Sequence, residues 1–339
     1  MLGRGRQPPR FGVHPSGPAV VGSPVMSVVV VGAGLSGIAC ATELVAAGVP
    51  VRVLDRADHV GGRMATCTVD GRAVDTGAAY FTVRDPEFAQ VVGRWRTAGL
   101  ARPWTVELTV LGGVRPGRSP GPVRWAAPRG LRSLVEHLAR DVPVELGRTV
   151  RHVGPGPTVD GRPADTVVLA MPDPQAARIL DHATEAYAAV RGRPWRPVLT
   201  VVAGFAERTW PQLPAAFVNG HPVVSLVADD GNRRGDAAPV LVAHSTAEVA
   251  RRHESDPDAG IPEVVEAVGE LLDVRGAPVW TRAYRWRSAA PERDRDVPFL
   301  LGSDGVALAG DGWGSSRIET AWRSGTLLGR ELARRHASP

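Results

Sequence analysis

Three glycines near the start of the chain have the spacing of a phosphate-binding loop. The segment Gly32-Ala33-Gly34-Leu35-Ser36-Gly37 directly follows a predicted strand at 27–31. In a Rossmann unit the first glycine permits a tight turn, the second lets the backbone approach a pyrophosphate, and the third lets the next helix pack against the strand. Dinucleotide binding is therefore the first chemistry that we predict, with the candidate residues Gly32, Ala33, Gly34, Ser36 and Gly37.

An acidic residue supports this interpretation from the position where a ribose is bound. A predicted helix at 38–47 and a predicted strand at 51–54 lead to Asp55, which stands 18 positions after Gly37. This is the usual place of the carboxylate that accepts hydrogen bonds from the ribose hydroxyls. We therefore add Asp55 and its neighbour Arg56 to the cofactor site. The alternative is that Asp55 only caps the next turn.

A glycine doublet indicates which dinucleotide is bound. Gly61, Gly62 and Arg63 complete the spacing Asp-x5-Gly-Gly-Arg, which resembles a motif of FAD-dependent amine oxidases and their relatives. Paired glycines expose backbone N–H groups to phosphate oxygens, and an arginine adds a charged donor. The motif favours FAD over a nicotinamide cofactor and assigns Gly62 and Arg63 to it. The alternative is a plain β-turn with a surface arginine.

A second glycine-rich segment lies near the other end of the chain. A predicted strand at 306–309 leads to Gly310-Asp311-Gly312-Trp313, and a predicted helix follows at 319–333. In the resembling enzymes the Gly-Asp pair binds the ribityl chain of FAD, and the next helix points its N-terminus at the flavin ring. The alternative for Asp311 is a helix-entry residue. The candidate cofactor residues here are Gly310, Asp311, Arg317, Ile318 and Glu319.

Because the cofactor segments are far apart in the chain, the predicted cofactor domain is discontinuous. We predict an α/β fold of two domains (α+β), with a Rossmann-like FAD-binding domain and a substrate domain. The first residues are rich in Gly, Pro and Arg and are expected to form a disordered tail before Met26, a candidate start. The predicted boundaries are 1–25 for the tail, 26–80, 128–182 and 298–336 for the FAD-binding domain, and 81–127 and 183–297 for the substrate domain.

Three further elements are predicted in the middle part of the cofactor domain. They are a helix at 131–139 and strands at 142–146 and 165–170. In the last predicted helix, Gly325 and Gly329 lie one turn apart on one face and are expected to allow close packing.

Six segments along the chain together resemble one family, the renalases. The resemblance runs from Met26 to near Ala333. It implies a p-hydroxybenzoate-hydroxylase-like fold with noncovalent FAD. It also implies oxidation of the 2- or 6-dihydro isomers of NAD(P)H by hydride transfer to flavin N5, with molecular oxygen reduced to hydrogen peroxide. The segments are VDTGAAYFT (74–82), APRGLRSL (127–134), VVLAMPDP (167–174), LVAHST (241–246), YRWR (284–287) and AGDGW (309–313).

The resemblance also implies roles for particular residues. Gly77 and Ala78, in the first segment, fall at the cofactor. Ala79 stands where the family usually carries Gln, so an amide hydrogen bond near the flavin or the substrate is missing. The substrate must be held with its donor carbon about 3 to 3.5 Å from flavin N5. The predicted catalytic residues, which do this positioning, are Tyr80, His244 and Trp286.

The absence of lysine bears on the reaction. All 40 residues counted as Lys or Arg are arginines. Monoamine and polyamine oxidases generally place a lysine on a water beside flavin N5, so a standard amine oxidase is disfavoured. A dihydropyridine becomes an aromatic pyridinium on losing hydride, so it needs no strong base.

Two alternative functions stay open at this point. One is another flavin enzyme, an amine oxidase or desaturase, and the other is a nonenzymatic dinucleotide-binding module. An NAD-dependent dehydrogenase is disfavoured, because it leaves the glycine doublet and the Gly310-Asp311 pair unexplained.

Composition and charge exclude several other classes of protein. The formal net charge is only +5, with three positive charges in the first ten residues, so we predict no nucleic-acid partner. Cys40 and Cys67 form neither a CxxC motif nor part of a histidine cluster, which predicts no metal site. No apolar run approaches the roughly 20 residues of a membrane span, so no membrane partner is predicted. The expected setting is cytoplasmic, with a small-molecule substrate and molecular oxygen as partners.

Overall fold

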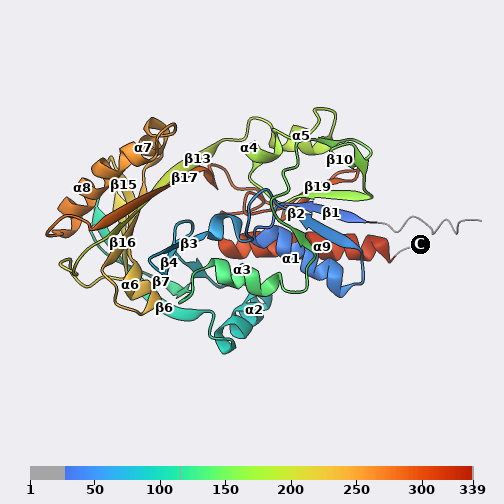
Figure 1. Ribbon diagram of the computed structural model, residues 1–339. Helices are drawn as coiled ribbons and strands as arrows, with labels where there is room; N and C mark the ends of the chain where they lie inside the picture. Colours follow the sequence, from blue (N-terminus) through green and yellow to red (C-terminus); the bar gives the residue numbers. More distant parts are fainter. Residues whose placement is uncertain (1–26, 115, 338–339) are drawn as a thin grey trace, which may run out of the picture.

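The computed structural model describes residues 27–114 and 116–337. Two large sheets, one of six strands and one of eight, lie at opposite ends of the molecule (Figure 1). Each sheet takes its strands from widely separated parts of the sequence, so the chain passes between the two ends several times. The predicted tail at 1–25 lies outside the described residues.

The six-stranded sheet has the order β18-β19-β12-β1-β2-β8 and is parallel except for its edge strand β18. The four valines of β1 at its centre are at most 6% exposed, as expected for a parallel strand covered on both faces. The predicted strand at 142–146 is shortened to the two residues of β8. The strands are β1 (Val28–Val31), β2 (Val51–Leu54), β8 (Val144–Glu145), β12 (Thr166–Leu169), β18 (Leu300–Leu301) and β19 (Val306–Leu308).

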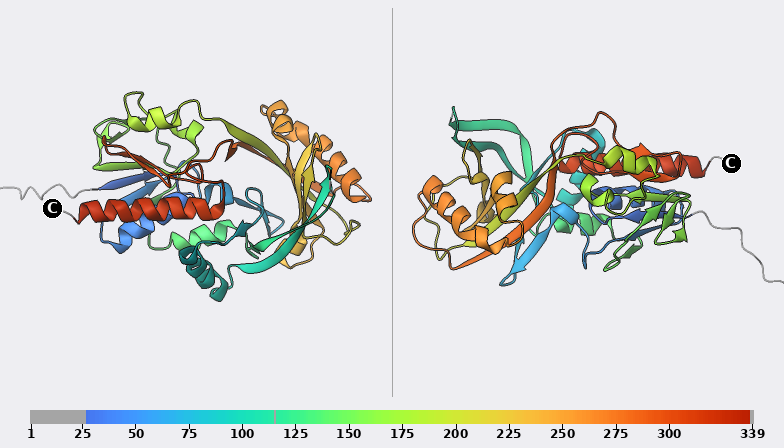
Figure 2. Two further views of the ribbon diagram at one scale, coloured as in Figure 1. Left: turned by 180° about the vertical axis from the view of Figure 1, so that it is seen from behind. Right: turned by 90° about the horizontal axis from the view of Figure 1, so that it is seen from above.

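Helices α1 and α9 cover one face of this sheet and pack closely on each other (Figure 2). A Cβ on Gly325 would lie 1.9 Å from the carbonyl oxygen of Ser36, and a Cβ on Gly329 would lie 2.6 Å from that of Cys40. The predicted close packing through these two glycines is confirmed. The helices on this side are α1 (Leu35–Ala46), α2 (Pro86–Thr97), α3 (Arg132–Leu138) and α9 (Ile318–His336).

Smaller elements cover the other face of the six-stranded sheet. Side chains of β1 alternate between the two sides: Val28 and Val30 pack toward α1, whereas Val29 and Val31 pack toward a three-stranded antiparallel sheet and two short helices. These elements are β9 (Val153–Gly154), β10 (Thr158–Val159), β11 (Arg162–Pro163), α4 (Asp173–Ala176) and α5 (Glu185–Val190).

The eight-stranded sheet has the order β17-β13-β16-β15-β14-β6-β7-β5. It is antiparallel except for the parallel pair β14 and β6. Helices α7 and α8 cover its outer face. The strands are β5 (Phe81–Thr82), β6 (Arg102–Gly112), β7 (Gly117–Ala126), β13 (Trp195–Gly204), β14 (Ala215–Asn219), β15 (Val224–Asp229), β16 (Val240–Ser245) and β17 (Trp280–Pro291).

Alternation along β13 and β16 decides which side chains face the six-stranded sheet. Leu199 and Val201 pack outward against α7 and α8, whereas Val202 packs inward against Val74 of the β3–β4 hairpin. Thr200 and His244 are paired across β13 and β16 and therefore share this inner face. The remaining elements are η1 (Gly62–Met64), β3 (Thr66–Val69), β4 (Arg72–Asp75), α6 (Asp230–Arg234), α7 (Ala247–Arg252), η2 (Asp258–Gly260) and α8 (Ile261–Leu272).

The architecture is a mixed α/β fold with a Rossmann-like part, as the sequence predicts. Helix α2 lies inside the predicted substrate segment 81–127, yet it packs with α9: the rings of Phe88 and Trp322 are 5.2 Å apart between centroids. Packing therefore joins α2 to the Rossmann-like part. In the chain, however, α2 follows β5, which is a strand of the eight-stranded sheet.

Candidate active site

The glycines of the loop 32–37 are required for different reasons. Gly32 has φ +114°, and a Cβ there would lie 2.5 Å from the carbonyl oxygen of Ala170. A Cβ on Gly37 would lie 1.9 Å from the carbonyl oxygen of Gly32. A Cβ on Gly34, in contrast, would meet no atom within 4 Å. The outer glycines therefore serve packing, while the middle one borders open space that a phosphate group fits.

Ser36 supplies a second sign of a missing ligand. Its side chain is 5% exposed, and its hydroxyl has no hydrogen-bond partner within the described part of the chain. It lies in the first turn of α1, where the N-cap residue gives no side-chain cap and backbone N–H groups are free to bind an anion. A buried polar group of this kind needs a partner, and a phosphate oxygen of a dinucleotide fits the position.

Asp55 lies where the sequence predicts, at the carboxyl end of β2 beside the loop. Its carboxylate accepts hydrogen bonds from the backbone N–H of Ala33 at 2.6 Å and of Ala57 at 2.8 Å. Each carboxylate oxygen keeps further acceptor capacity for ribose hydroxyls. Ala33 itself is fully buried and contributes its backbone to this link. Arg56 is exposed, and among the described residues its side chain has no hydrogen bond or ion pair.

The glycine doublet, Gly61 and Gly62, packs directly on the loop 32–37. The Gly61 N–H donates to the carbonyl of Ala33 at 2.9 Å. Gly62 is exposed at φ +55°, and a Cβ there would lie 3.3 Å from the Cα of Gly34. The doublet and the loop thus form one backbone-lined cradle.

The structure brings together Arg63 and Asp311, which the sequence assigns to two separate parts of the predicted cofactor site. The Arg63 guanidinium makes a bidentate ion pair with the Asp311 carboxylate, with 2.9 Å between Nη1 and Oδ2, and also donates to the carbonyl of Ala289 at 3.1 Å. Asp311 in addition accepts from Ser316 Oγ at 2.6 Å. Two motifs that are 248 positions apart are therefore joined. Arg63 is held by Asp311 rather than free to serve phosphate oxygens alone.

The predicted cofactor residues at the start of α9 also make contacts within the protein. The backbone N–H of Gly310 donates to Ser324 Oγ at 2.9 Å. Glu319 is buried, and its Oε1 accepts from the backbone N–H groups of Arg84 and Asp85, both at 2.6 Å. This contact explains the burial of Glu319 without a cofactor. Arg317 is the exposed N-cap residue of α9, and Ile318 is half-buried.

Two of the three predicted catalytic residues, His244 of β16 and Trp286 of β17, approach the segment 76–80 from the eight-stranded sheet, and the third, Tyr80, belongs to that segment. Trp286 donates its Nε1–H to the carbonyl of Thr76 at 2.8 Å. His244 contacts the backbone of Gly77. Ala78, half-buried, lies between this contact and Ala79 in the same segment. Tyr80 closes the segment, with its ring 6.2 Å from that of Trp104.

His244 is held neutral. Burial first, and the charge of Arg233 second, lower the pKa of His244 to about 4, against the opposing effect of the Gly77 backbone. Its Nε2 and the hydroxyl of the paired Thr200 are both buried with no hydrogen-bond partner within the described part of the chain. Two adjacent polar groups on the inner face therefore remain available to a ligand.

The sequence reasoning missed Arg233, which is 1% exposed. Its Nη1 donates to the carbonyl of Ala79 at 2.9 Å, and its Nε donates to Asp230 at 3.0 Å. Asp230 also pairs with Arg72 and Arg234. Burial would raise the pKa of Asp230, but these three guanidinium groups outweigh it and hold the pKa below the usual value. Ala79 is thus tied to a buried ionic cluster through its backbone.

A signal for this cluster is present in the sequence. The run 229–234 places two aspartates before two arginines, with opposite charges three and four positions apart, directly after an apolar strand. Such spacing puts the charges on one helix face.

Arg124 is a second residue that the sequence reasoning missed, and no sequence pattern marks it. It is 6% exposed, and its Nε and Nη1 have no partner among the described residues. Its guanidinium lies 5.7 Å from the centroid of the Tyr80 ring.

The described residues contain no group of three or more His, Cys, Asp or Glu side chains that could hold a metal ion. In the same part of the chain, no helix is long and apolar enough to cross a membrane.

Short stretches of the chain are similar to curated flavoenzymes. Hydroxyneurosporene desaturase of Rubrivivax gelatinosus is 47% identical over 57 residues, which is 17% of this chain and 11% of that protein. Putrescine oxidase of Kocuria rosea is 45% identical over 65 residues, which is 19% of this chain and 14% of that protein. The matched part is therefore a small fraction of the length of these relatives.

Solved structures resemble the whole fold. Cyclohexylamine oxidase from Brevibacterium oxydans IH-35A has a TM-score of 0.71 at 14% identity, covering 92% of this chain and 100% of that chain. A variant of putrescine oxidase also has a TM-score of 0.71, at 17% identity with the same coverage. Identities this low establish a shared fold.

Two family models match the chain. One, described as an NAD(P)-binding Rossmann-like domain, matches residues 30–95, which contain the phosphate loop, Asp55 and the glycine doublet. The other, described as flavin containing amine oxidoreductase, matches residues 111–331 and so covers more than half of the chain. It includes α6, His244, Trp286 and the Gly310-Asp311 segment. The protein belongs to the flavin-containing amine oxidoreductase family.

Proposed function

We propose that the protein binds FAD without a covalent bond and oxidises the 2- or 6-dihydro isomers of NAD(P)H, with molecular oxygen as the electron acceptor. The observation that carries this proposal is the electrostatic character of the site. A buried arginine without a counter-ion lies beside Tyr80, a neutral histidine faces the segment 76–80, and the sequence has no lysine.

The proposed FAD site uses the backbone of the loop 32–37 and the doublet for the pyrophosphate, with Ser36 Oγ as an additional donor. Asp55 is placed for the ribose, and the Gly310-Asp311 segment for the ribityl chain. Noncovalent binding is supported by the state of Cys40, because burial raises the pKa of its thiol to about 12 and a thiol of this kind is not nucleophilic.

The charges at the site suit an anionic substrate better than an amine. Arg124 has no ion-pair partner among the described residues and is 6% exposed. A buried charge needs a partner, and the pyrophosphate of a dinucleotide supplies one. A protonated amine would be repelled by the same guanidinium. This contrast favours a dihydropyridine dinucleotide over a simple amine.

The protein residues act by binding and orientation. FAD, when bound, supplies the hydride-accepting ring and the route of the electrons to oxygen. Trp286 presents an aromatic surface beside Thr76. The neutral imidazole of His244 and the Thr200 hydroxyl offer hydrogen bonds to a polar substituent such as a carboxamide. No side chain has to remove a proton, because the substrate becomes aromatic on losing hydride.

An amine oxidase is the second candidate. Its support is the fold shared with putrescine oxidase and cyclohexylamine oxidase. At 17% and 14% sequence identity, this similarity establishes a common fold and not a common substrate. A nonenzymatic dinucleotide-binding module is the third candidate. It would not explain why the Thr200 hydroxyl and His244 Nε2 lack hydrogen-bond partners among the described residues.

Anaerobic stopped-flow mixing of the purified flavoprotein with candidate donors tests the proposal. We expect rapid bleaching of the flavin by 2- or 6-dihydro isomers of NAD(P)H, slow bleaching by ordinary NADH or by putrescine, and hydrogen peroxide on admitting air. Rapid bleaching by an amine and not by the isomers would establish the amine-oxidase alternative. No bleaching by any donor would establish the binding module.

The Arg124→Gln variant tests the electrostatic argument separately. We expect KM for the dinucleotide isomers to rise about tenfold, the equivalent of losing one charge-assisted contact. The dihydro isomer of 1-methylnicotinamide, which has no phosphate, should be oxidised equally well by both proteins. A similar loss with both substrates would remove Arg124 from phosphate recognition.

A further inference from the structure

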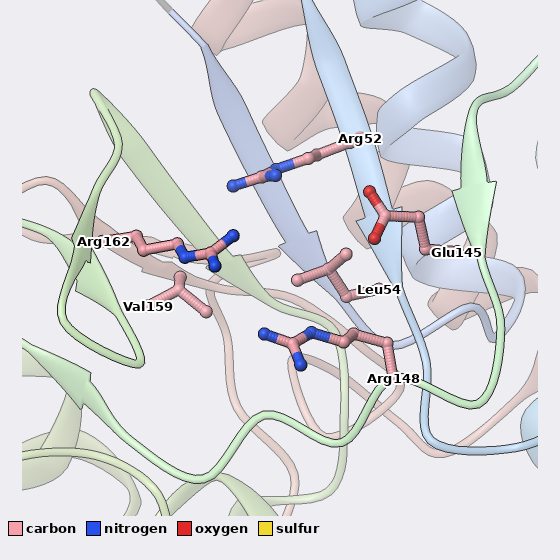
Figure 3. A pocket seen from close by; sticks show the side chains of 6 residues that line it. All are labelled: Arg52, Leu54, Glu145, Arg148, Val159 and Arg162. Carbon is pink, nitrogen blue, oxygen red and sulfur yellow. The ribbon is translucent and has the colours of Figure 1, made fainter.

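A cavity of about 310 Å³ opens on the six-stranded sheet, on the face away from α1. It lies between β2 and β8 on one side and β10 and β11 on the other (Figure 3). Its volume is at the lower end of the range for small-molecule sites. The lining residues are Arg52, Leu54, Glu145, Arg148, Val159 and Arg162.

Three guanidinium groups from three separate parts of the chain enter this cavity. Arg52 comes from β2, Arg148 from the loop after β8, and Arg162 from β11, and all three point into the same space (Figure 3). Arg148 has a long contact of 3.9 Å with Asp160. Within the described residues, the side chains of Arg52 and Arg162 have neither a hydrogen bond nor an ion pair, and Glu145 pairs with none of the three.

This arrangement attracts an anion, since three guanidinium groups share the cavity with a single carboxylate, that of Glu145. Guanidinium groups stay charged at any physiological pH, and like charges that share a half-enclosed space repel one another. Their planar forks match the oxygens of a phosphate group. The floor is apolar, because Leu54 and Val159 are 4% and 5% exposed. The cavity thus offers one cationic end, which suits an anion, and one apolar surface.

We propose that this cavity is a binding site for a small phosphate monoester of about the size of a mononucleotide. The phosphate binds to Arg52 and Arg162 with support from Arg148, and the organic part lies on Leu54 and Val159. The site goes beyond the proposed oxidase function, since it shares no residue with the cradle assigned to FAD.

The cavity is nevertheless connected to the predicted ribose-binding residue through the backbone. The N–H of Asp55 donates to the carbonyl of Glu145 at 3.0 Å, and the N–H of Arg148 donates to the carbonyl of Asp55 at 2.7 Å. A test must therefore separate binding in this cavity from competition at the cofactor site.

Isothermal titration of the flavin-loaded protein with AMP, inorganic phosphate and adenosine makes this separation. We expect AMP and inorganic phosphate to bind with flavin retained, AMP more tightly than phosphate, and adenosine at least about tenfold more weakly than AMP, because one charge-assisted phosphate contact is worth about that factor. AMP affinity should fall as salt is added. Absence of binding by AMP and phosphate, equal binding of adenosine, or release of flavin on AMP addition would each overturn the proposal.

Variants locate the site. Arg52→Gln combined with Arg162→Gln should weaken AMP binding by about tenfold or more, with flavin content unchanged as the measure of folding. If the double variant fails to fold, Arg162→Gln alone serves, because Arg162 is exposed on a two-residue strand. The matched control is Arg191→Gln, an exposed arginine outside the cavity, which should bind AMP like the parent. Unchanged affinity in the Arg162→Gln variant would refute the assignment.

Discussion

The carboxyl edge of the six-stranded sheet and the inner face of the eight-stranded sheet are built on opposite principles. The first is made of backbone: the loop 32–37 and the doublet approach each other because neither has side chains in the way. The second is made of side chains from distant strands, backed by buried charges. A backbone cradle can be coded by a short glycine motif, whereas a side-chain surface needs the whole sheet.

The two regions therefore differ in how they should fail. Damage to the cradle should remove the cofactor while the fold survives. Substitutions in the buried charges behind the inner face should lower the free energy of unfolding, and activity should fall as a consequence. Four substitutions, from the largest expected effect to the smallest, test this contrast.

The largest effect is expected from Gly34→Val. A Cβ there meets no protein atom within 4 Å, so the fold should tolerate the substitution, but the side chain would occupy the space proposed for the pyrophosphate. We expect near-complete loss of flavin from the purified protein with little change in the melting temperature of the apoprotein. The matched control is Gly269→Val in α8, where the space around a Cβ is equally open. A normal ratio of flavin to protein in Gly34→Val would place the cofactor elsewhere.

The next effect is expected from Asp230→Asn. This carboxylate is fully buried and neutralises Arg72, Arg233 and Arg234. Arg72 and Arg234 keep a second carboxylate partner, but Arg233 loses its only ion pair among the described residues. Leaving that buried charge uncompensated costs about 3–5 kcal/mol of unfolding free energy. Urea unfolding measures the loss. Glu331→Gln, which breaks exposed ion pairs on α9, should change stability little. Equal effects of the two substitutions would contradict a special role for the buried cluster.

A third effect concerns pH and His244. The pKa of His244 is about 4 in the folded protein, against about 6.5 in an unfolded chain. The unfolded chain therefore takes up a proton first as pH falls. Stability from this group is fully present above pH 6.5 or so and is lost toward pH 4, by roughly 3 kcal/mol in total. His244→Asn should flatten the urea-unfolding profile in this range, and His336→Asn, an exposed site, should leave it unchanged. Identical profiles for all three proteins would rule out a depressed pKa.

The smallest effect is expected from Trp286→Phe. The substitution keeps an aromatic ring but removes the N–H that satisfies the Thr76 carbonyl, which costs about 1 kcal/mol of unfolding free energy. FAD should remain bound, while flavin reduction by the isomers should slow. Trp280→Phe on the same strand removes no hydrogen bond between described residues and should retain the parent rate. Loss of flavin in the Trp286→Phe variant would contradict the expectation that the cradle alone retains the cofactor.

The sequence by itself determined the backbone cradle formed by the loop 32–37 and the glycine doublet, together with its supporting elements. Gly32, Gly34, Gly37, Asp55 and the doublet are close in the chain, and each acts through local geometry: a positive φ, a missing Cβ or a strand end. The burial of the β1 valines and the close helix packing at Gly325 and Gly329 were likewise predicted correctly, because hydrophobic periodicity and residue size are local properties. The helix predicted at 38–47 begins three residues later and ends one residue later than α1 does in the structure.

Only the tertiary structure decided how distant residues share their partners. Arg63 and Asp311 each look like a cofactor residue, yet long-range folding pairs them with each other. Glu319 lies at a helix start, but its carboxylate binds the amides that begin α2. Arg233 becomes important because the fold brings its guanidinium to the Ala79 carbonyl and places its charge near His244. Charges and hydrogen bonds act across space irrespective of chain separation, so their final partners depend on contacts that no local spacing encodes.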